Sequence, residues 1–137
     1  MANGTAVLDA WVRKTKARQE AVLKTAAQSL FAEANLAVGK GGKMPLDTGF
    51  LRASFDASLS GMPVGPSRGE GGGNPDNAGN VAAVISNATT GDTIFGGWTA
   101  VYARRQEYER YGFARSAADN WQTHVNNAIA VAKAAVP

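Results

Sequence analysis

Two carboxylates in an arginine-rich segment are the first residues whose types and spacing suggest chemistry. Glu107 and Glu109 stand two positions apart, so they diverge on a helix but share a face on a strand. A carboxylate pair with a suitable gap supports acid–base hydrolysis. However, Arg104, Arg105 and Arg110 lie three or four positions away, and helical ion pairs explain the carboxylates more simply. We therefore favour a structural role over a hydrolase that uses Glu107.

The histidine and cysteine content removes most other catalytic and metal chemistry. The 137 residues include one histidine and no cysteine, which excludes thiolate zinc sites, multi-histidine sites, disulfides and cysteine nucleophiles. His124 has Asn120 and Asn127 about one helical turn away, and a lone histidine on a helix surface is more often a bystander than a catalyst. The glycine-rich segments 39–44 and 61–79 lack the closing Gly-Lys-Ser/Thr of a phosphate-binding loop. The sequence predicts no catalytic residue, no cofactor and no metal, so we do not expect an enzyme.

Arginine and tyrosine interleave in the segment 102–115. This mixture suits base stacking in nucleic-acid binding, but the same two residue types are enriched at protein–protein hot spots. Glu107 and Glu109 in its middle repel phosphates, which favours a protein interface. Some of the aromatic rings are expected to complete the core against the last helix instead. The residues that we expect at or near an interface are Trp98, Arg105, Tyr108, Tyr111 and Phe113.

Two amphipathic helices are expected to position these residues. Residues 7–38 carry apolar side chains at steps of three and four, from Leu8 and Trp11 to Leu30, and glycines follow from Gly39. A helix of roughly 30 residues is about 45 Å long, so either it bends or one end projects and packs on something else. A second helix is predicted for residues 116–135, with Trp121 and Ala128 on its apolar stripe.

The region 44–101 between the helices has the signals of a small sheet. Asp47 or Thr48 is expected to cap a short helical turn, and alternation after Phe55 predicts a strand over 55–60. Residues 81–86 are predicted to form a strand, with 93–99 as its hairpin partner and a turn over 87–92. The pair Gly96-Gly97 predicts a bulge or a close backbone approach.

Glycine and proline concentrate in the segment 61–79, which holds seven glycines and three prolines. Such a composition does not bury enough surface to offset the cost of ordering, and we expect a long mobile loop. Together these elements predict one α+β domain over residues 1–137, in which the N- and C-terminal helices pack on a small, mostly antiparallel sheet. Alanine supplies nearly half of the hydrophobic residues, and the larger apolar and aromatic side chains number only 35, which indicates a lean core that needs help from neighbouring subunits.

The net charge of +3 is spread unevenly along the chain, because residues 1–52 carry most of the positive charge. An alternative hypothesis is therefore a nucleic-acid-binding accessory protein that contacts DNA through the N-terminal helix. No apolar run approaches the roughly 20 residues of a membrane-spanning helix, so no membrane partner is expected. The basic residues of the alternative are Arg13, Lys14, Lys16, Arg18 and Lys24.

The order of these features resembles the minor tail and tail-completion proteins of long-tailed bacteriophages, which are small neck components at the head–tail junction. Two short motifs carry the resemblance. The first is a D-T-G-x-L-R-x-S box, and the second is Y-A-x-x-x-E-Y, followed here by Glu109-Arg110-Tyr111 before Gly112. The matching residues are Asp47, Thr48, Gly49, Leu51, Arg52, Ser54, Tyr102, Ala103, Glu107 and Tyr108.

The resemblance implies a structural protein of the virion that assembles in the host cytoplasm as a homo-oligomeric ring, with six copies expected. It implies contacts with the tail-tube protein and with head connector or adaptor proteins, and passage of DNA through the lumen without specific binding. Under this hypothesis Asp47 and Thr48 cap a turn and Arg52 holds the first strand. The loop 61–79 is then expected to reach a partner ring or the lumen.

Overall fold

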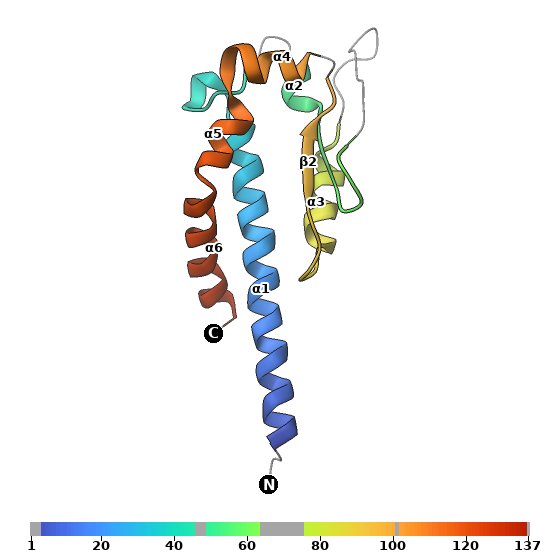
Figure 1. Ribbon diagram of the computed structural model, residues 1–137, viewed down its shortest axis with the longest axis vertical. Coiled ribbons are helices and arrows are strands. Elements are labelled where there is room, and N and C mark those ends of the chain that lie inside the picture. The colour runs from blue at the N-terminus through green and yellow to red at the C-terminus, as the bar shows by residue number, and fades with distance from the viewer. Residues whose placement is uncertain (1–3, 46–48, 64–75, 101, 137) are drawn as a thin grey trace.

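The computed structural model describes residues 4–45, 49–63, 76–100 and 102–136. It confirms the α+β class, because long helices at both ends of the chain accompany a two-stranded antiparallel sheet. Helix α1 (Gly4–Ala34) is central. Helices α5 (Phe113–Asp119) and α6 (Trp121–Ala135) lie on one side of it, and the sheet with helix α3 (Ala78–Asn87) lies on the other (Figure 1).

Helix α6 runs antiparallel to the C-terminal half of α1. At one end of the contact Asn120 donates a hydrogen bond to Glu33, and at the other the Arg18 Nε donates to the carbonyl of Val136 at 2.6 Å. Ala128 and Ala132 are the buried residues of α6. Most of the buried apolar residues of the described chain are alanines. Small side chains therefore fill much of the interior, as the lean composition predicts.

Both long helices differ in length from the prediction. Helix α1 runs from Gly4 to Ala34 rather than over 7–38, and after it the Asn35 side chain donates to the Phe31 carbonyl at 2.9 Å. A 3₁₀ turn, η1 (Val38–Lys40), follows, and Ala37 pairs with Met44 in an isolated parallel bridge. The predicted helix 116–135 is two helices, α5 and α6, which meet at Asn120.

The sheet pairs β1 (Phe55–Ser58) with β2 (Phe95–Trp98), so the predicted strands 55–60 and 93–99 exist but pair with each other. Phe55 lies opposite Trp98, and the one-to-one register contains no bulge. A Cβ on Gly96 would come within 2.6 Å of the Phe31 ring. The close approach at Gly96 is therefore made by an aromatic ring of α1 rather than by another backbone.

The predicted strand 81–86 is wrong, because these residues lie in helix α3. Val81, Val84, Ile85 and Ala88 are spaced at three and four residues, and they are the residues of this segment that are half-buried or buried. Asn77 precedes the helix, so residues 78 and 79 of the predicted loop are helical, while residues 64–75 of that loop lie outside the described residues. The predicted turn exists: Asp92 accepts hydrogen bonds from the Thr89 amide and hydroxyl, and it joins α3 to β2.

Four short elements close one end of the molecule. Helix α2 (Phe50–Ala53) faces helix α4 (Ala103–Gln106), which continues into the π-helical turn η2 (Glu107–Tyr111) and then into α5. The core cluster at this end joins residues that are far apart in the sequence, from the segments 44–51 and 100–113: Met44, Phe50, Leu51, Ala100, Ala103 and Phe113. The best-packed part of the core therefore lies far from the N-terminus.

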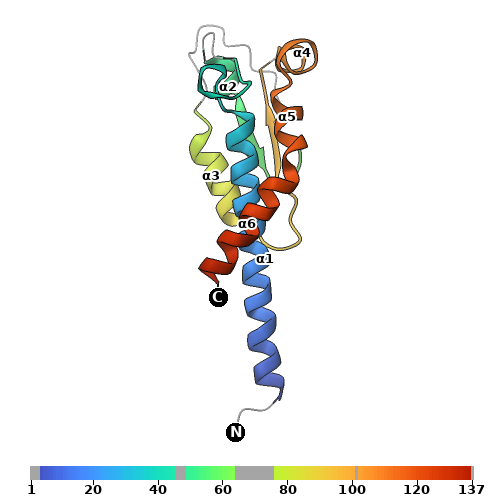
Figure 2. The same cartoon turned by 90° about the vertical axis from the view of Figure 1, so that its left-hand side faces the viewer.

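The N-terminal third of α1 extends past the C-terminal end of α6 in both views (Figures 1 and 2). It also extends past the end of the sheet at which β2 begins. Lys16 marks the point where α1 meets the turn before β2, because its carbonyl accepts a hydrogen bond from the Thr90 hydroxyl at 3.5 Å. Residues 4–15 span about 18 Å at the helical rise. The long first helix therefore projects at one end, which is one of the two outcomes that its length predicts.

Candidate assembly surfaces

The two motifs that carry the resemblance meet in space. Leu51 of the first motif and Ala103 of the second are both buried in the core cluster. Ser54 is fully buried: its hydroxyl donates to the Leu51 carbonyl at 2.7 Å, and its own carbonyl accepts from the Thr99 amide at 3.1 Å. These motif residues hold α2, β1 and the chain after β2 together, so their role in a single chain is architectural.

The other residues of the first motif have different places. Gly49 precedes α2 with a φ of +79°, which a residue with a side chain rarely adopts. Gly49 occupies the N-cap position of α2 and has no side chain that could cap it. Asp47 and Thr48, the expected caps, lie outside the described residues. Arg52 is exposed, and within the described residues no polar contact joins it to β1. The expectation that Arg52 holds the first strand therefore finds no support in its contacts: β1 is held by its pairing with β2 and is tied to α3 by Asn80, which donates to Asp56 at 2.7 Å.

Glu107 of the second motif caps a helix. Its two carboxylate oxygens accept hydrogen bonds from the amides of Ala114 at 2.8 Å and Arg115 at 2.9 Å. These are two of the first amides of α5, which have no partner within the helix. The carboxylate also lies at the positive end of the helix dipole. Glu107 therefore has a structural role, although the expected arginine partner is replaced by backbone amides, whereas Glu109 pairs with Arg105 at 3.0 Å as predicted.

Substitution Glu107→Ala is expected to lower the free energy of unfolding by about 1–2 kcal/mol, because it exposes two amides that the carboxylate satisfies. The matched control is Glu109→Ala, whose side chain is 61% exposed in its ion pair; removal of such a surface pair is expected to cost less than about 0.5 kcal/mol. Urea unfolding followed by far-UV circular dichroism measures both. Equal losses for the two variants would contradict the capping role.

The expected interface residues divide into two groups. Phe113 is 2% exposed and packs its ring edge-on against Trp98 at 4.7 Å, while the Trp98 Nε1 donates to Asn35 at 2.8 Å. Phe113 belongs to the core cluster, and the half-buried Trp98 packs against it within one chain. Their expected place at or near a subunit contact stays a prediction. Tyr108 and Tyr111 remain exposed, at 67% and 37%.

The exposed part of the arginine–tyrosine segment forms a small surface on α4 and η2. The Arg104 guanidinium lies 5.7 Å from the centre of the Tyr108 ring, a cation–π distance. Arg105 and Glu109 border the same shallow hollow of about 440 Å³. This surface is polar and lies at the end of the molecule opposite the projecting helix (Figure 1).

His124 faces α1. Its Nε2 lies 3.2 Å from the Glu33 carboxylate, which also accepts a hydrogen bond from Asn120 at 2.7 Å. The group ties α6 to α1 near the start of α6, so His124 contributes to helix packing.

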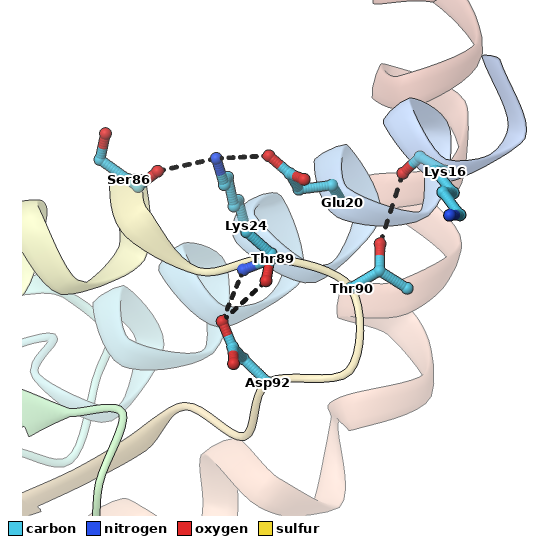
Figure 3. Close-up of polar contacts among 7 residues, drawn as sticks. All are labelled: Lys16, Glu20, Lys24, Ser86, Thr89, Thr90 and Asp92. Atoms are coloured by element: carbon cyan, nitrogen blue, oxygen red, sulfur yellow. Dashed lines mark hydrogen bonds and ion pairs between the residues drawn. The ribbon is translucent and has the colours of Figure 1, made fainter. Parts of the chain in front are cut away.

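Two of the five basic residues of α1 contact other parts of the same chain. Lys24 donates to the Ser86 carbonyl in the last turn of α3 at 2.8 Å and pairs with Glu20 at 2.9 Å (Figure 3). Arg18 donates to Val136 just after α6. Each cation therefore stabilises the negative end of a helix, and Arg13, Lys14 and Lys16 are the exposed members of the set.

The projecting end of α1 exposes large apolar side chains. Val7 is 61% exposed, Leu8 58% and Trp11 63%. Leu8, Trp11 and Val12 are three and four residues apart, so they share one helix face. These residues continue the predicted stripe beyond the point where α1 has neighbours, and we call residues 7–12 the helix tip.

A groove of about 1030 Å³ opens on the other half of the molecule, between α1, α2, β1 and α3. Phe31 and Leu36 of the α1 side and Val81 and Ile85 of α3 line it. No residue of α3 is buried, although the helix is rich in apolar residues. We call this the α1–α3 groove.

Sequence reasoning missed the groove because it placed Val81–Ser86 in a strand. The signal for a helix was present in the spacing of Val81, Ile85 and Ala88, and it was outweighed by the β-branched residues.

No protein-family model, curated protein or solved structure matches this chain. Within the described ranges, no three His, Cys, Asp or Glu side chains gather closely enough to hold a metal ion. Among the helices that the structure describes, none is long and apolar enough to cross a membrane.

Proposed function

We propose that this chain is a structural protein of the neck or tail end of a long-tailed bacteriophage, which assembles as a ring that completes the tail and joins it to the head. The observation that carries the proposal is the helix tip, where three large apolar side chains are exposed on a helix that extends beyond its own domain. Contiguous exposed apolar side chains mark protein contacts. The motif resemblance gives that contact its context, a homo-oligomeric ring of about six copies.

Two opposite ends with different chemistry support a ring that stands between two partners. One end carries the apolar helix tip and the other carries Arg104, Arg105, Tyr108 and Tyr111. Tyrosine and arginine are favoured at protein interfaces. We assign the arginine–tyrosine surface to contact with the head connector, an adaptor or the tail-tube protein.

Static light scattering of the purified chain over a range of concentrations tests the assembly. The expected result is a particle of about six times the 14.2 kDa chain mass. A mass that stays at that of one chain at every concentration, and in the presence of tail components, would contradict the proposal.

The DNA-binding alternative makes a different prediction. It requires low-salt binding of duplex DNA that weakens steeply with salt and loses slope when Arg13, Lys14 and Lys16 become alanine. Under the ring proposal the same triple variant retains the wild-type mass, because those three cations are exposed and are not the apolar contact residues.

A further inference from the structure

We infer that the helix tip of one copy docks in the α1–α3 groove of a second copy. The inference rests on the proposed ring assembly and names its contact. Both surfaces belong to every chain, and both are apolar and exposed. Val7, Leu8 and Trp11 are more than half exposed, and Phe31, Val81 and Ile85 are half-buried around the groove.

The tip does not reach the groove of its own chain. Tip and groove share the single continuous helix α1, and the first α1 residue that lines the groove is Gln28. Trp11 and Gln28 are therefore separated by about 26 Å of helix at 1.5 Å per residue. A straight helix does not fold back over that distance, so a second chain must supply the occupant.

Size and charge fit a helix in the groove. The volume of about 1030 Å³ accepts a few large side chains, and an amphipathic helix presents such anchors at i, i+3 and i+4. The exposed charges also complement one another, because Asp9 lies in the helix tip and Arg52 lines the groove.

The contact area favours a closed assembly over an isolated pair. Half the side of a cylinder about 10 Å wide and about 18 Å long is roughly 300 Å². Counted on both partners, one contact buries about 600 Å², below the roughly 1,200 Å² of a stable pair. Because the tip and the groove are different surfaces, each chain makes two contacts, and such head-to-tail contacts form a ring when the rotation closes.

Site-directed photocross-linking tests the contact. The chain has no cysteine, so Trp11→Cys provides a single thiol for a benzophenone maleimide, which restores an aromatic group at that position. Labelled chain is mixed with ¹⁵N-enriched wild-type chain and irradiated, and the cross-linked peptides are identified by mass spectrometry. The expected cross-links join position 11 to residues 28–36 or 76–85 of the isotopically distinct chain.

Asn126→Cys is the matched control, because Asn126 is exposed on α6, a helix that contributes no residue to the lining of the groove. It is expected to give no cross-link to the groove. Cross-links from position 11 to a second helix tip or to any other surface, or no interchain cross-link at all, would overturn the inference. The mass of the same sample separates the two proposals: a ring without groove cross-links contradicts only the docking, whereas a single-chain mass contradicts the ring itself.

Discussion

Phe113→Ala is expected to lower the free energy of unfolding by about 3–5 kcal/mol, the range for removal of a buried phenylalanine. Phe113 is 2% exposed, belongs to the core cluster with Phe50 and Leu51, and packs on Trp98 with ring centres 4.7 Å apart. Most of the other buried side chains are alanines, so little neighbouring volume is available to refill the cavity. Since small domains are stable by only about 5–15 kcal/mol, this one change removes a large share of the total.

Urea unfolding followed by tryptophan fluorescence measures the effect, because Trp98 lies against the substituted ring. Tyr108→Ala is the control: its ring is 67% exposed and contacts Arg104 at the surface, and a loss below about 1 kcal/mol is expected. A similarly small loss of unfolding free energy for Phe113→Ala would show that the core cluster does not stabilise the chain as proposed.

Gly42→Ala is expected to cost at least about 2 kcal/mol, which places it among the larger single-residue effects. A Cβ at Gly42 would lie 2.0 Å from the carbonyl oxygen of Leu36 and 2.4 Å from its carbonyl carbon. These are backbone atoms, and the same Leu36 carbonyl accepts the amide of Met44 at 3.0 Å. Relief of the clash therefore breaks the bridge that holds Met44, a residue with no exposed surface, in the core.

Gly39→Ala in the same turn is the matched control, since a Cβ there meets nothing within 4 Å. Thermal unfolding is expected to show a fall of at least about 6 °C for Gly42→Ala and a change within about 2 °C for Gly39→Ala. Equal melting temperatures for the two variants would mean that the turn before the first motif adjusts freely and does not anchor Met44.

The periodicity of apolar residues predicted α1 and β1, because buried side chains recur at regular intervals along a helix or a strand. The apolar positions of α1 recur over many turns, and the alternation after Phe55 reports one buried face of β1. The helix α3 was missed because its ten residues are too few for periodicity to outweigh the β-branched Val81, Val84 and Ile85. Residues 59–94 separate β1 from β2. Their pairing depends on tertiary contacts, such as that between the rings of Phe31 and Phe55, whose centres are 4.8 Å apart, and local sequence does not encode it.

The candidate surfaces were also predictable where local sequence determines them, and not where tertiary contacts do. The excess length of the first helix predicted either a bend or a projecting end, and the structure has the second, with Trp11 exposed at that end. Residue type alone does not show whether an aromatic side chain lies at the surface or in the core. Tyr108 and Phe113 were therefore grouped, although Tyr108 is exposed and Phe113 is buried. Likewise, Glu107 satisfies amides that become available only when α5 begins at Phe113. The groove requires α3 to be a helix, and so it was not predicted.

Electron microscopy of the purified chain at high concentration tests the proposed ring most directly. Class averages of the wild-type chain are expected to show a closed ring with a central opening and about sixfold symmetry. The double variant Leu8→Ser with Trp11→Ser is expected to abolish the ring. It is expected to leave the melting temperature of the domain unchanged, because both side chains are exposed in a single chain. Single particles of the wild-type chain without rotational symmetry, or rings that persist in the double variant, would contradict assembly through the helix tip.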